Sequence, residues 1–291
     1  MKNNKQILVT GGAGFVGTNL IKLLLKKTSY KIVSIDNYTS GTKLNHIRSP
    51  RVKYIKGNTA NISKFVKNPN KIKTIFHFGE FARIYQSFLK MDQCIESNSI
   101  GTNAIFNFCL KHKVKLIYSA TSASLGNKGN DRNLSPYAFT KAKNLELLEN
   151  LKKWFNFKYE VIYFYNVYGP HQICRGQMST VIGIFEDHYK RKEPLPVVLP
   201  GTQTRRFTHI SDTVEICYLA WKKNLCRHYS IASKKSYSVL EVAKIFKSKI
   251  KFLPRRQGER YASALTKMNL SNKIYKHFGK IKLKDYIHDL I

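Results

Sequence analysis

Acidic residues are scarce in this sequence. Its 291 residues include 17 Asp and Glu against 51 Lys and Arg, which gives a formal net charge of +34. Clustered Lys and Arg would indicate a nucleic-acid-binding protein. The lysines here are spread almost evenly, and no nucleic-acid-binding motif is present. We therefore expect no nucleic-acid partner, and a lysine-rich surface that helps to attract anionic substrates.

The sequence also lacks cysteine motifs and long apolar runs. Its five cysteines form neither a Cys-x-x-Cys pair nor a zinc-binding pattern, and we interpret them as free thiols in a reducing compartment. No apolar segment is long enough to span a bilayer, and the N-terminal residues show no signal-peptide cleavage pattern. We expect a cytoplasmic protein with no metal site and no membrane association.

Short apolar strand patterns alternate with helical patterns in the first part of the chain. The strand patterns lie at 6–11, 31–36, 52–57, 74–79, 115–121 and 159–169, and the helical patterns at 15–27, 62–66, 94–112 and 137–156. Such alternation is typical of a parallel sheet with helices on both faces. The sequence therefore predicts an α/β fold: a doubly wound (Rossmann) parallel sheet over residues 1–170, and a smaller C-terminal substrate-binding region over 171–291 that returns some strands to the main sheet.

A glycine-rich loop joins the first predicted strand to the first predicted helix. It reads TGGAGFVG, with glycines at positions 11, 14 and 17. Gly11 suits the tight turn, Gly14 lets the backbone approach a pyrophosphate, and Gly17 allows close packing of helix and strand. The N-terminal amides of the helix can then hold the anion. This arrangement predicts a dinucleotide cofactor.

The end of the second predicted strand indicates which dinucleotide binds. Asp36, followed by Asn37, lies about twenty residues after the glycine loop, where a carboxylate accepts hydrogen bonds from the ribose and repels a 2′-phosphate. We therefore expect NAD rather than NADP. Asn58, at the end of the third predicted strand, is a candidate contact for the adenine amino group, with a plain turn role as the alternative.

Tyr137 and Lys141 stand four residues apart in SPYAFTK, so both side chains project from one face of the predicted helix. Ser135 and Pro136 suit the start of that helix. A free tyrosine has a pKa near 10, so a base at neutral pH needs about 4 kcal/mol of stabilisation of the phenolate. Lys141 and the positive nicotinamide ring would both supply it.

Seven motifs taken together resemble one known family. They are TGGAGFVG, IDNYTSG, IYSATSASLG, SPYAFTK, YFYNVYGP, TQTRRFTHISD and LPRRQGE, in the family's order along the chain. The sequence resembles an extended short-chain dehydrogenase/reductase of the nucleotide-sugar epimerase/dehydratase group, nearest to UDP-glucose 4-epimerase. The resemblance implies a homodimer built through the helices at 94–112 and 137–156, and a nucleotide-sugar substrate, expected to be UDP-linked.

The resemblance also implies a mechanism. Tyr137 takes the proton of the sugar 4-hydroxyl while NAD oxidises C4, and the keto-sugar turns over and is reduced on its other face. Thr121 matches the Ser or Thr that hydrogen-bonds the reacting oxygen, and Lys141 matches the lysine that holds the nicotinamide ribose. We expect further cofactor contacts from Phe15, Val16, Phe78, Gly79 and Asn98.

Substrate-binding residues are implied in the same way. Asn166, Arg205 and Arg256 match residues that hold the diphosphate, and Glu259 matches an acceptor for the nucleotide ribose. Ser263 stands at the position that lines the pocket beside the sugar C2 substituent, where a small residue leaves space for an N-acetyl group. We expect from this that a UDP-N-acetylhexosamine is accepted.

Several departures from the family limit these expectations. The dehydratases carry an Asp-Glu pair directly after the catalytic threonine, where this chain has Ser122 and Ala123. A 4-epimerase is therefore preferred, with a 4,6-dehydratase and a non-catalytic dinucleotide-binding protein as alternatives. Glu80 and Arg83 occupy positions near the nicotinamide where small or neutral residues are common. His77, at a strand end, is interpreted as a packed histidine rather than a base.

Overall fold

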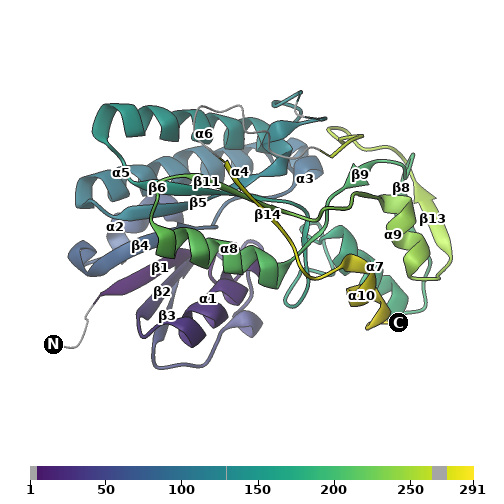
Figure 1. Cartoon of the computed structure of the whole chain (residues 1–291), viewed down its shortest axis with the longest axis horizontal. Coiled ribbons are helices and arrows are strands. Elements are labelled where there is room, and N and C mark those ends of the chain that lie inside the picture. Colours follow the sequence, from purple (N-terminus) through teal and green to yellow (C-terminus); the bar gives the residue numbers. More distant parts are fainter. Residues whose placement is uncertain (1–4, 129, 264–273) are drawn as a thin grey trace.

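A parallel sheet of eight strands forms the centre of the larger part of the protein, in a computed structural model that describes residues 5–128, 130–263 and 274–291 (Figure 1). The strand order is β14-β11-β6-β5-β4-β1-β2-β3, and every pairing is parallel. The predicted doubly wound sheet is confirmed. The strands are β1 Gln6–Thr10, β2 Lys31–Asp36, β3 Val52–Lys56, β4 Ile72–His77, β5 Lys115–Thr121, β6 Tyr159–Phe164, β11 His228–Ala232 and β14 Ile274–Phe278.

Helices cover both faces of this sheet, which is why its strands read as continuous apolar runs. One face packs against α1 (Phe15–Lys27) and α8 (Ile210–Lys223), whose buried side chains include Leu20, Leu24 and Trp221. The other face packs against α2 (Ile62–Phe65), α5 (Thr102–His112) and α6 (Pro136–Phe155), with Phe106 and Leu148 fully buried. Figure 1 shows these two layers on opposite sides of the strands. Each such side chain stabilises the fold by about 1.5–3 kcal/mol.

The helix predicted over residues 94–112 is interrupted. The chain forms α3 (Ile84–Leu89) and α4 (Met91–Ile95), then the π-helical segment η4 (Glu96–Gly101), and only then α5. A π-helical turn inserts an extra residue into the hydrogen-bond ladder, which a 3.6-residue periodicity cannot reveal. At Gly101 a side chain would come within 2.4 Å of the Thr59 hydroxyl. The segment η4 therefore packs closely against η2 (Thr59–Asn61), the turn that follows β3.

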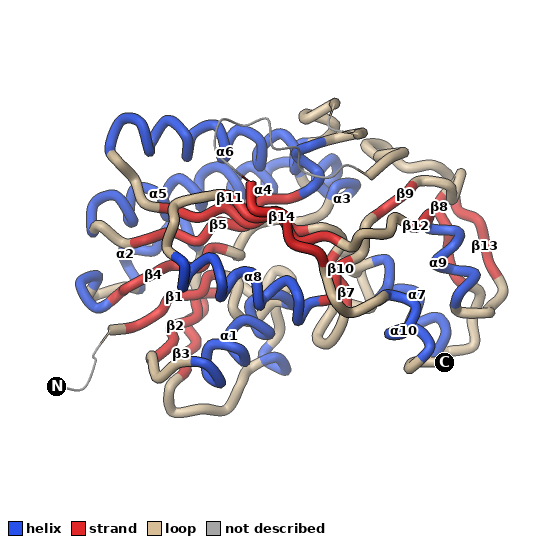
Figure 2. Tube along the Cα trace, in the orientation of Figure 1, coloured by secondary structure: helices blue, strands red, loops and turns tan. Residues whose placement is uncertain are grey.

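The smaller part of the protein has its own core, formed around Phe185, Val197, Phe246 and Ile287. Its short strands pair two by two, and Figure 2 shows them beside three helices. The helices are α7 Val181–Lys190, α9 Val239–Ile245 and α10 Leu283–His288, and the paired strands are β7 Val167–Tyr168 with β10 Thr208–His209, β8 Leu195–Val198 with β13 Ile250–Leu253, and β9 Thr204–Arg205 with β12 Tyr237–Ser238. The 3-10 turns are η1 Lys43–Asn45, η2 Thr59–Asn61, η3 Pro69–Lys71 and η5 Ser122–Leu125.

Two strands that follow residue 170, β11 and β14, extend the main sheet beside β6. The chain therefore passes more than once between the two parts, as the sequence had suggested, while the division at residue 170 stays a prediction. Among the described residues, none of the helices combines the length and apolar character needed to cross a lipid bilayer.

The strand order reverses between β1 and β4. In doubly wound sheets the ligand binds at such a reversal, in the crevice outside the carboxyl ends of the strands. In Figure 1 the smaller part lies beyond these carboxyl ends. We therefore expect a ligand to bind among the residues that follow β1, β2, β4 and β5.

Candidate active site

The glycine loop after β1 is built for close backbone approach. Gly11 has a φ of +69°, and a side chain there would come within 2.8 Å of the Gly79 amide nitrogen. A side chain at Gly17 would come within 2.1 Å of the Gly11 carbonyl oxygen, so α1 can start against the loop only with glycine at this position. Gly14 is the N-cap of α1 and has no side-chain cap, which leaves the N-terminal amides of Phe15 and its neighbours open to an anion.

Asp36 ends β2 beside this loop and is 6% exposed. One carboxylate oxygen accepts from the Ala13 amide at 2.9 Å and the other from the Tyr38 amide at 2.8 Å. Burial raises the pKa of Asp36, and these backbone hydrogen bonds act against the rise. A third backbone hydrogen bond comes from Gly14. A carboxylate has about four acceptor positions, so one remains for a ribose hydroxyl. Asp36 and Asn37 line a small cavity together with Gly11 and Gly79, so four predicted cofactor residues meet there.

Asn58 has protein partners at both ends of its side chain. Its carbonyl oxygen accepts from the Ala60 amide at 3.0 Å and caps η2, and its amide group donates to Glu96 at 3.1 Å. This geometry matches the turn role that the sequence left open. A contact with adenine stays a prediction.

The other predicted cofactor residues lie at the start of α1, after β4 and in η4. Phe15, Val16 and Phe78 pack partly buried against the core below α1. Asn98 in η4 is fully buried; it accepts from the Phe81 amide at 2.7 Å and donates to the Phe81 carbonyl at 3.0 Å. Asn98 therefore fixes the backbone beside Gly79, and a direct contact with the cofactor stays a prediction.

Tyr137 and Thr121 come together at the carboxyl end of β5. Tyr137 lies in the first turn of α6, which begins as predicted, with Ser135 as N-cap accepting from the Ala138 amide at 3.1 Å. Thr121 is the last residue of β5, and its side chain hydrogen-bonds Tyr137 and accepts from the Ala123 amide at 3.1 Å. A phenol and an alcohol thus share one buried hydrogen bond.

The charges around Tyr137 differ from the expectation. Burial raises the pKa of Tyr137 to about 12, and Glu80 adds to that rise. The hydrogen bond from Thr121 lowers the pKa, as do the positive charges of Arg83 and Arg260. The sequence predicted that Lys141 would lower the pKa of Tyr137. In the structure the Lys141 ammonium is paired with the Glu80 carboxylate. We attribute the difference to Glu80.

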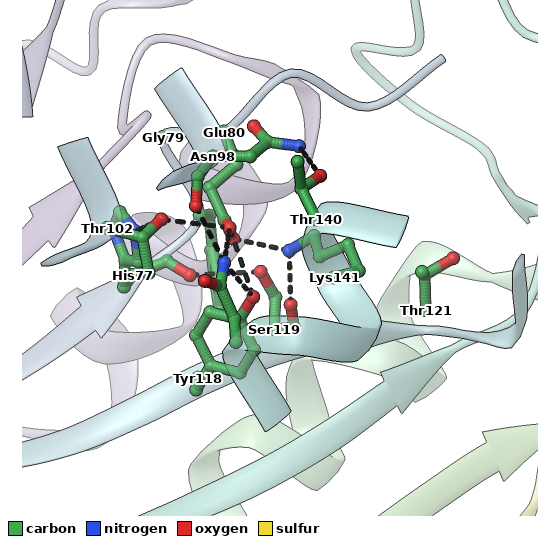
Figure 3. Close-up of polar contacts among 12 residues, drawn as sticks. His77, Gly79, Glu80, Asn98, Thr102, Tyr118, Ser119, Thr121, Thr140 and Lys141 are labelled. Atoms are coloured by element: carbon green, nitrogen blue, oxygen red, sulfur yellow. Dashed lines mark hydrogen bonds and ion pairs between the residues drawn. The ribbon is translucent and has the colours of Figure 1, made fainter. Parts of the chain in front are cut away.

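Lys141 forms a buried ion pair with Glu80, which follows β4 (Figure 3). The ammonium also donates to the backbone carbonyl of Ser119 in β5. Burial lowers the pKa of Lys141, and the charge of Glu80 opposes that effect. The stretch that follows Thr121 contains no acidic residue. The site does contain one, because Glu80, which follows β4, forms an ion pair with Lys141.

His77 is the packed histidine that the sequence indicated. It is fully buried at the end of β4, with its ring nitrogens 2.7 Å from the Thr10 hydroxyl and 3.0 Å from the Thr102 hydroxyl. Burial lowers the pKa of His77 to about 4, so the ring is neutral at physiological pH. With both nitrogens engaged, His77 has no free position for proton transfer with a substrate.

Two of the predicted substrate residues meet each other. Arg205 is 6% exposed and forms an ion pair with Glu259, and it also donates to the Arg260 carbonyl at 2.7 Å. Asn166 donates to the Arg206 carbonyl at 3.2 Å, close to β9. These contacts tie together the segments expected to hold a diphosphate.

The remaining two predicted substrate residues lie on the segment before the gap in the described residues. Arg256 is exposed, with its guanidinium 5.4 Å from the centre of the Tyr85 ring. Ser263 donates its amide to the Thr204 hydroxyl at 3.2 Å, while its own hydroxyl is buried and has no hydrogen-bond partner among the described residues. The roles of both stay predictions.

Arg260 was not anticipated from the sequence. It is 3% exposed and donates to the Ser122 carbonyl at 2.8 Å, directly after Thr121. Burial lowers the pKa of Arg260 to about 10, and repulsion from Arg205 adds to this effect. In a chain with 51 basic residues, nothing in the pattern distinguishes this arginine from a solvated one. Glu80 was more visible, as an acid at a strand end in a chain that has few.

Comparison with known proteins identifies the family. The NAD dependent epimerase/dehydratase family matches residues 7–232, well over half of the sequence. The chain belongs to this family. An ADP-L-glycero-D-manno-heptose-6-epimerase from Brachyspira hyodysenteriae is 29% identical over 260 residues, which cover 83% of this chain and 80% of that protein. A dTDP-D-glucose 4,6-dehydratase from Bos taurus is 28% identical over 258 residues, 82% of this chain and 71% of the relative.

A solved structure supports the same fold. The UDP-glucose 4-epimerase from Thermotoga maritima, solved with UDP-glucose, superposes with a TM-score of 0.85 at 23% identity, covering 97% of this chain and 96% of that one. The protein is thus an NAD-dependent enzyme of the epimerase/dehydratase family. Its glycine loop and Asp36 suit NAD.

Asp36 provides a test of cofactor selection. Purified protein should release NAD rather than NADP on denaturation, because a carboxylate at the end of the second strand, where Asp36 lies, would repel a 2′-phosphate. Asp36→Asn should reduce the preference for NAD over NADP about tenfold, since it removes that repulsion. Cofactor affinities measured by calorimetry check this, with the exposed Asp289→Asn as a matched control. Recovery of mainly NADP from the wild type would contradict the assignment.

Proposed function

We propose that the protein is a nucleotide-sugar 4-epimerase acting on a UDP-hexose or a UDP-N-acetylhexosamine. The observation that carries the proposal is the hydrogen-bonded pair of Thr121 and Tyr137 at the carboxyl end of β5, where Ser122 and Ala123 follow Thr121. A buried phenol with a hydroxyl partner suits proton transfer to and from a sugar alcohol. Chemistry at C5 and C6 would need further acid and base groups that these positions lack.

In this mechanism Tyr137 takes the proton of the sugar 4-hydroxyl, and Thr121 orients the reacting oxygen. When bound, NAD supplies the redox chemistry at C4, accepting a hydride from the sugar and later returning it. Tyr137 gives its proton back to the oxygen after the 4-keto sugar has turned over. The positive charges of Arg83 and Arg260 favour the phenolate, which is the form of Tyr137 that takes the proton in the first step.

Glu80 does not replace the acid pair of the dehydratases. One of its oxygens is engaged by Lys141 and the other accepts from Thr102 at 3.0 Å and from Tyr118 at 3.1 Å. A carboxylate fixed in this way is not free to protonate a leaving hydroxyl. A 4,6-dehydratase is therefore the weaker alternative. A non-catalytic dinucleotide-binding protein would have no use for the buried Thr121–Tyr137 pair.

Binding of the nucleotide diphosphate is assigned to the smaller part of the protein. Arg205, held by Glu259, and the exposed Arg256 supply positive charge, which suits phosphate oxygens. Glu259 itself is 31% exposed at its side chain, so it can also accept from a ribose hydroxyl. Asn166 lies on the segment between the two parts.

Incubation of the purified protein with a panel of nucleotide sugars tests the proposal, with the products resolved by NMR. We expect interconversion of the C4 epimers of a UDP-hexose or UDP-N-acetylhexosamine, with no net loss of water. Formation of a 4-keto-6-deoxy sugar would identify a dehydratase instead. No change in any sugar, with NAD bound, would favour the non-catalytic alternative.

The outer helices of the main sheet support a prediction about assembly. Large apolar side chains are exposed along the segment from α4 to α5 and on α6, among them Met91 (57%), Ile100 (57%) and Phe139 (42%). Pairing of these helices with a second copy would bury them, so we predict a homodimer despite the positive charge. Light scattering at physiological salt should give twice the chain mass of 33.7 kDa. A monomeric mass would contradict this prediction.

A further inference from the structure

The Glu80 carboxylate is enclosed by hydrogen-bond donors. Its side chain is 2% exposed and that of Lys141 is 4% exposed. One oxygen receives the Lys141 ammonium, and the other accepts from the hydroxyls of Thr102 at 3.0 Å and Tyr118 at 3.1 Å. The Asn144 amide lies 3.5 Å from that second oxygen. Figure 3 shows Lys141, Thr102 and Tyr118 around the Glu80 side chain; they belong to α6, α5 and β5. Such a set of donors stabilises an ionised carboxylate in a fixed position.

The cluster around Lys141 carries no net charge as a result. Glu80 and Lys141 cancel, and the neighbouring His77 is neutral because its burial lowers its pKa to about 4. The Lys141 ammonium also lies 4.7 Å from the centre of the Tyr118 ring. If Glu80 were absent, a buried ammonium would remain without a counter-ion, which is the costly arrangement in a low-dielectric site.

This balance matters for the cofactor, because NAD+ and NADH differ in charge at the nicotinamide ring. The oxidised ring is positive and the reduced ring is neutral, so an unpaired cation nearby disfavours the oxidised form. Arg83 and Arg260 already place positive charge around Tyr137. An epimerase that begins each cycle by oxidising its substrate must hold NAD+, so excess positive charge would oppose the first step.

We propose that Glu80 is a positioning residue that holds Lys141 and offsets its charge, and that it thereby favours NAD+ over NADH in the site. The inference rests on the proposed function and on the role that the family resemblance implies for Lys141, beside the nicotinamide ribose. It explains why a carboxylate stands at the end of β4 in a chain with only 17 acidic residues. It also explains why both of its oxygens are engaged by the protein and not presented to a substrate.

The test compares the affinities of full-length Glu80→Gln for NAD+ and for NADH, each measured by exchange against bound nucleotide. Gln keeps the shape and can accept from Thr102 and Tyr118, but it leaves the Lys141 charge uncompensated. We expect binding of NAD+ to weaken about tenfold relative to NADH. The matched control is Glu146→Gln, an exposed acid on the same helix as Lys141, which should leave the ratio of the two affinities unchanged.

Lys141→Met provides a second variant, with the opposite expected effect on the affinity for NAD+ relative to NADH. It leaves the Glu80 charge unpaired, so NAD+ should bind more tightly relative to NADH, and this result remains informative if Glu80→Gln does not fold. A double variant carrying both changes should return the ratio to near the wild-type value. Equal weakening of both cofactors in Glu80→Gln, or an unchanged ratio in Lys141→Met, would overturn the proposal. No sugar is present in these measurements, so failure of the proposed epimerase activity would not be mistaken for failure here.

Discussion

Replacing Tyr137 with Phe should reduce turnover about a thousandfold, while the fold and the bound NAD are retained. The change removes the phenolic oxygen that, in the proposed mechanism, accepts the proton from the sugar. Stability should change by no more than about 1 kcal/mol, because Phe keeps the ring in its buried position and only one hydrogen bond, that with Thr121, is lost.

The pH profile of the same variant distinguishes a lost base from a disturbed site. Burial raises the pKa of Tyr137 to about 12, so the phenol is protonated near neutral pH. Positive charge close to the ring lowers this pKa and favours the phenolate. Activity that needs the phenolate rises with pH and is lost as pH falls through the pKa of Tyr137 in the loaded enzyme. The acid limb of kcat against pH should therefore disappear from the residual activity of Tyr137→Phe.

Stopped-assay kinetics of wild type, Tyr137→Phe and Tyr189→Phe, with NAD content measured for each, complete the test. Tyr189 lies on α7 in the smaller part, where its hydroxyl donates to the C-terminal carbonyl of Ile291 at 3.3 Å, so its loss should leave turnover unchanged. Near wild-type turnover by Tyr137→Phe would show that another group is the base.

Local patterns predicted the parts of the site that lie close together in the sequence. The helix at Phe15–Lys27 and the strand at Lys31–Asp36 have the predicted bounds, because the glycine loop and the apolar runs mark their ends clearly. Tyr137 and Lys141 share one helix, so their spacing alone places them on the same face. These elements needed no information from distant segments.

Contacts between distant segments could not be predicted in the same way. Glu80 and Lys141 are 61 residues apart, and they meet because β4 pairs with β5 in the sheet and α6 packs against β5. The sequence marked Glu80 as unusual but gave no reason to pair it with the lysine. Arg260 reaches Ser122 across 138 residues, and no local pattern predicts that contact. The charge environment of Tyr137 therefore had to come from the structure.

Replacing Ser263 with Tyr should lower kcat/KM for UDP-N-acetylglucosamine by about a hundredfold and change that for UDP-glucose by no more than about threefold. The family resemblance places Ser263 beside the sugar C2 substituent. The structure adds a reason to expect a ligand there, because the Ser263 hydroxyl is buried and finds no hydrogen-bond partner within residues 5–128, 130–263 and 274–291. A buried donor left unpaired costs free energy that an acetamide oxygen could recover.

The backbone around Ser263 is held firmly enough for this effect to be steric. The Ser263 amide donates to the Thr204 hydroxyl at 3.2 Å, and the preceding amides of Tyr261 and Ala262 donate to the Asn127 side chain at 3.0 and 3.2 Å. Asn127 follows η5, which begins directly after Thr121, so these hydrogen bonds hold the segment close to the carboxyl end of β5. A tyrosine side chain at position 263 would then fill the space that an N-acetyl group needs, and a C2 hydroxyl would need much less of it.

Ser263→Ala separates the steric effect from the hydrogen bond. It removes the hydroxyl and leaves the space, so kcat/KM for UDP-N-acetylglucosamine should fall by about tenfold at most, with little change for UDP-glucose. The measurement is kcat/KM for both sugars in wild type and in the two variants. An unchanged ratio of the two substrates in Ser263→Tyr would show that Ser263 does not line the pocket, whereas equal loss of both would show a disturbed fold in place of a change in specificity.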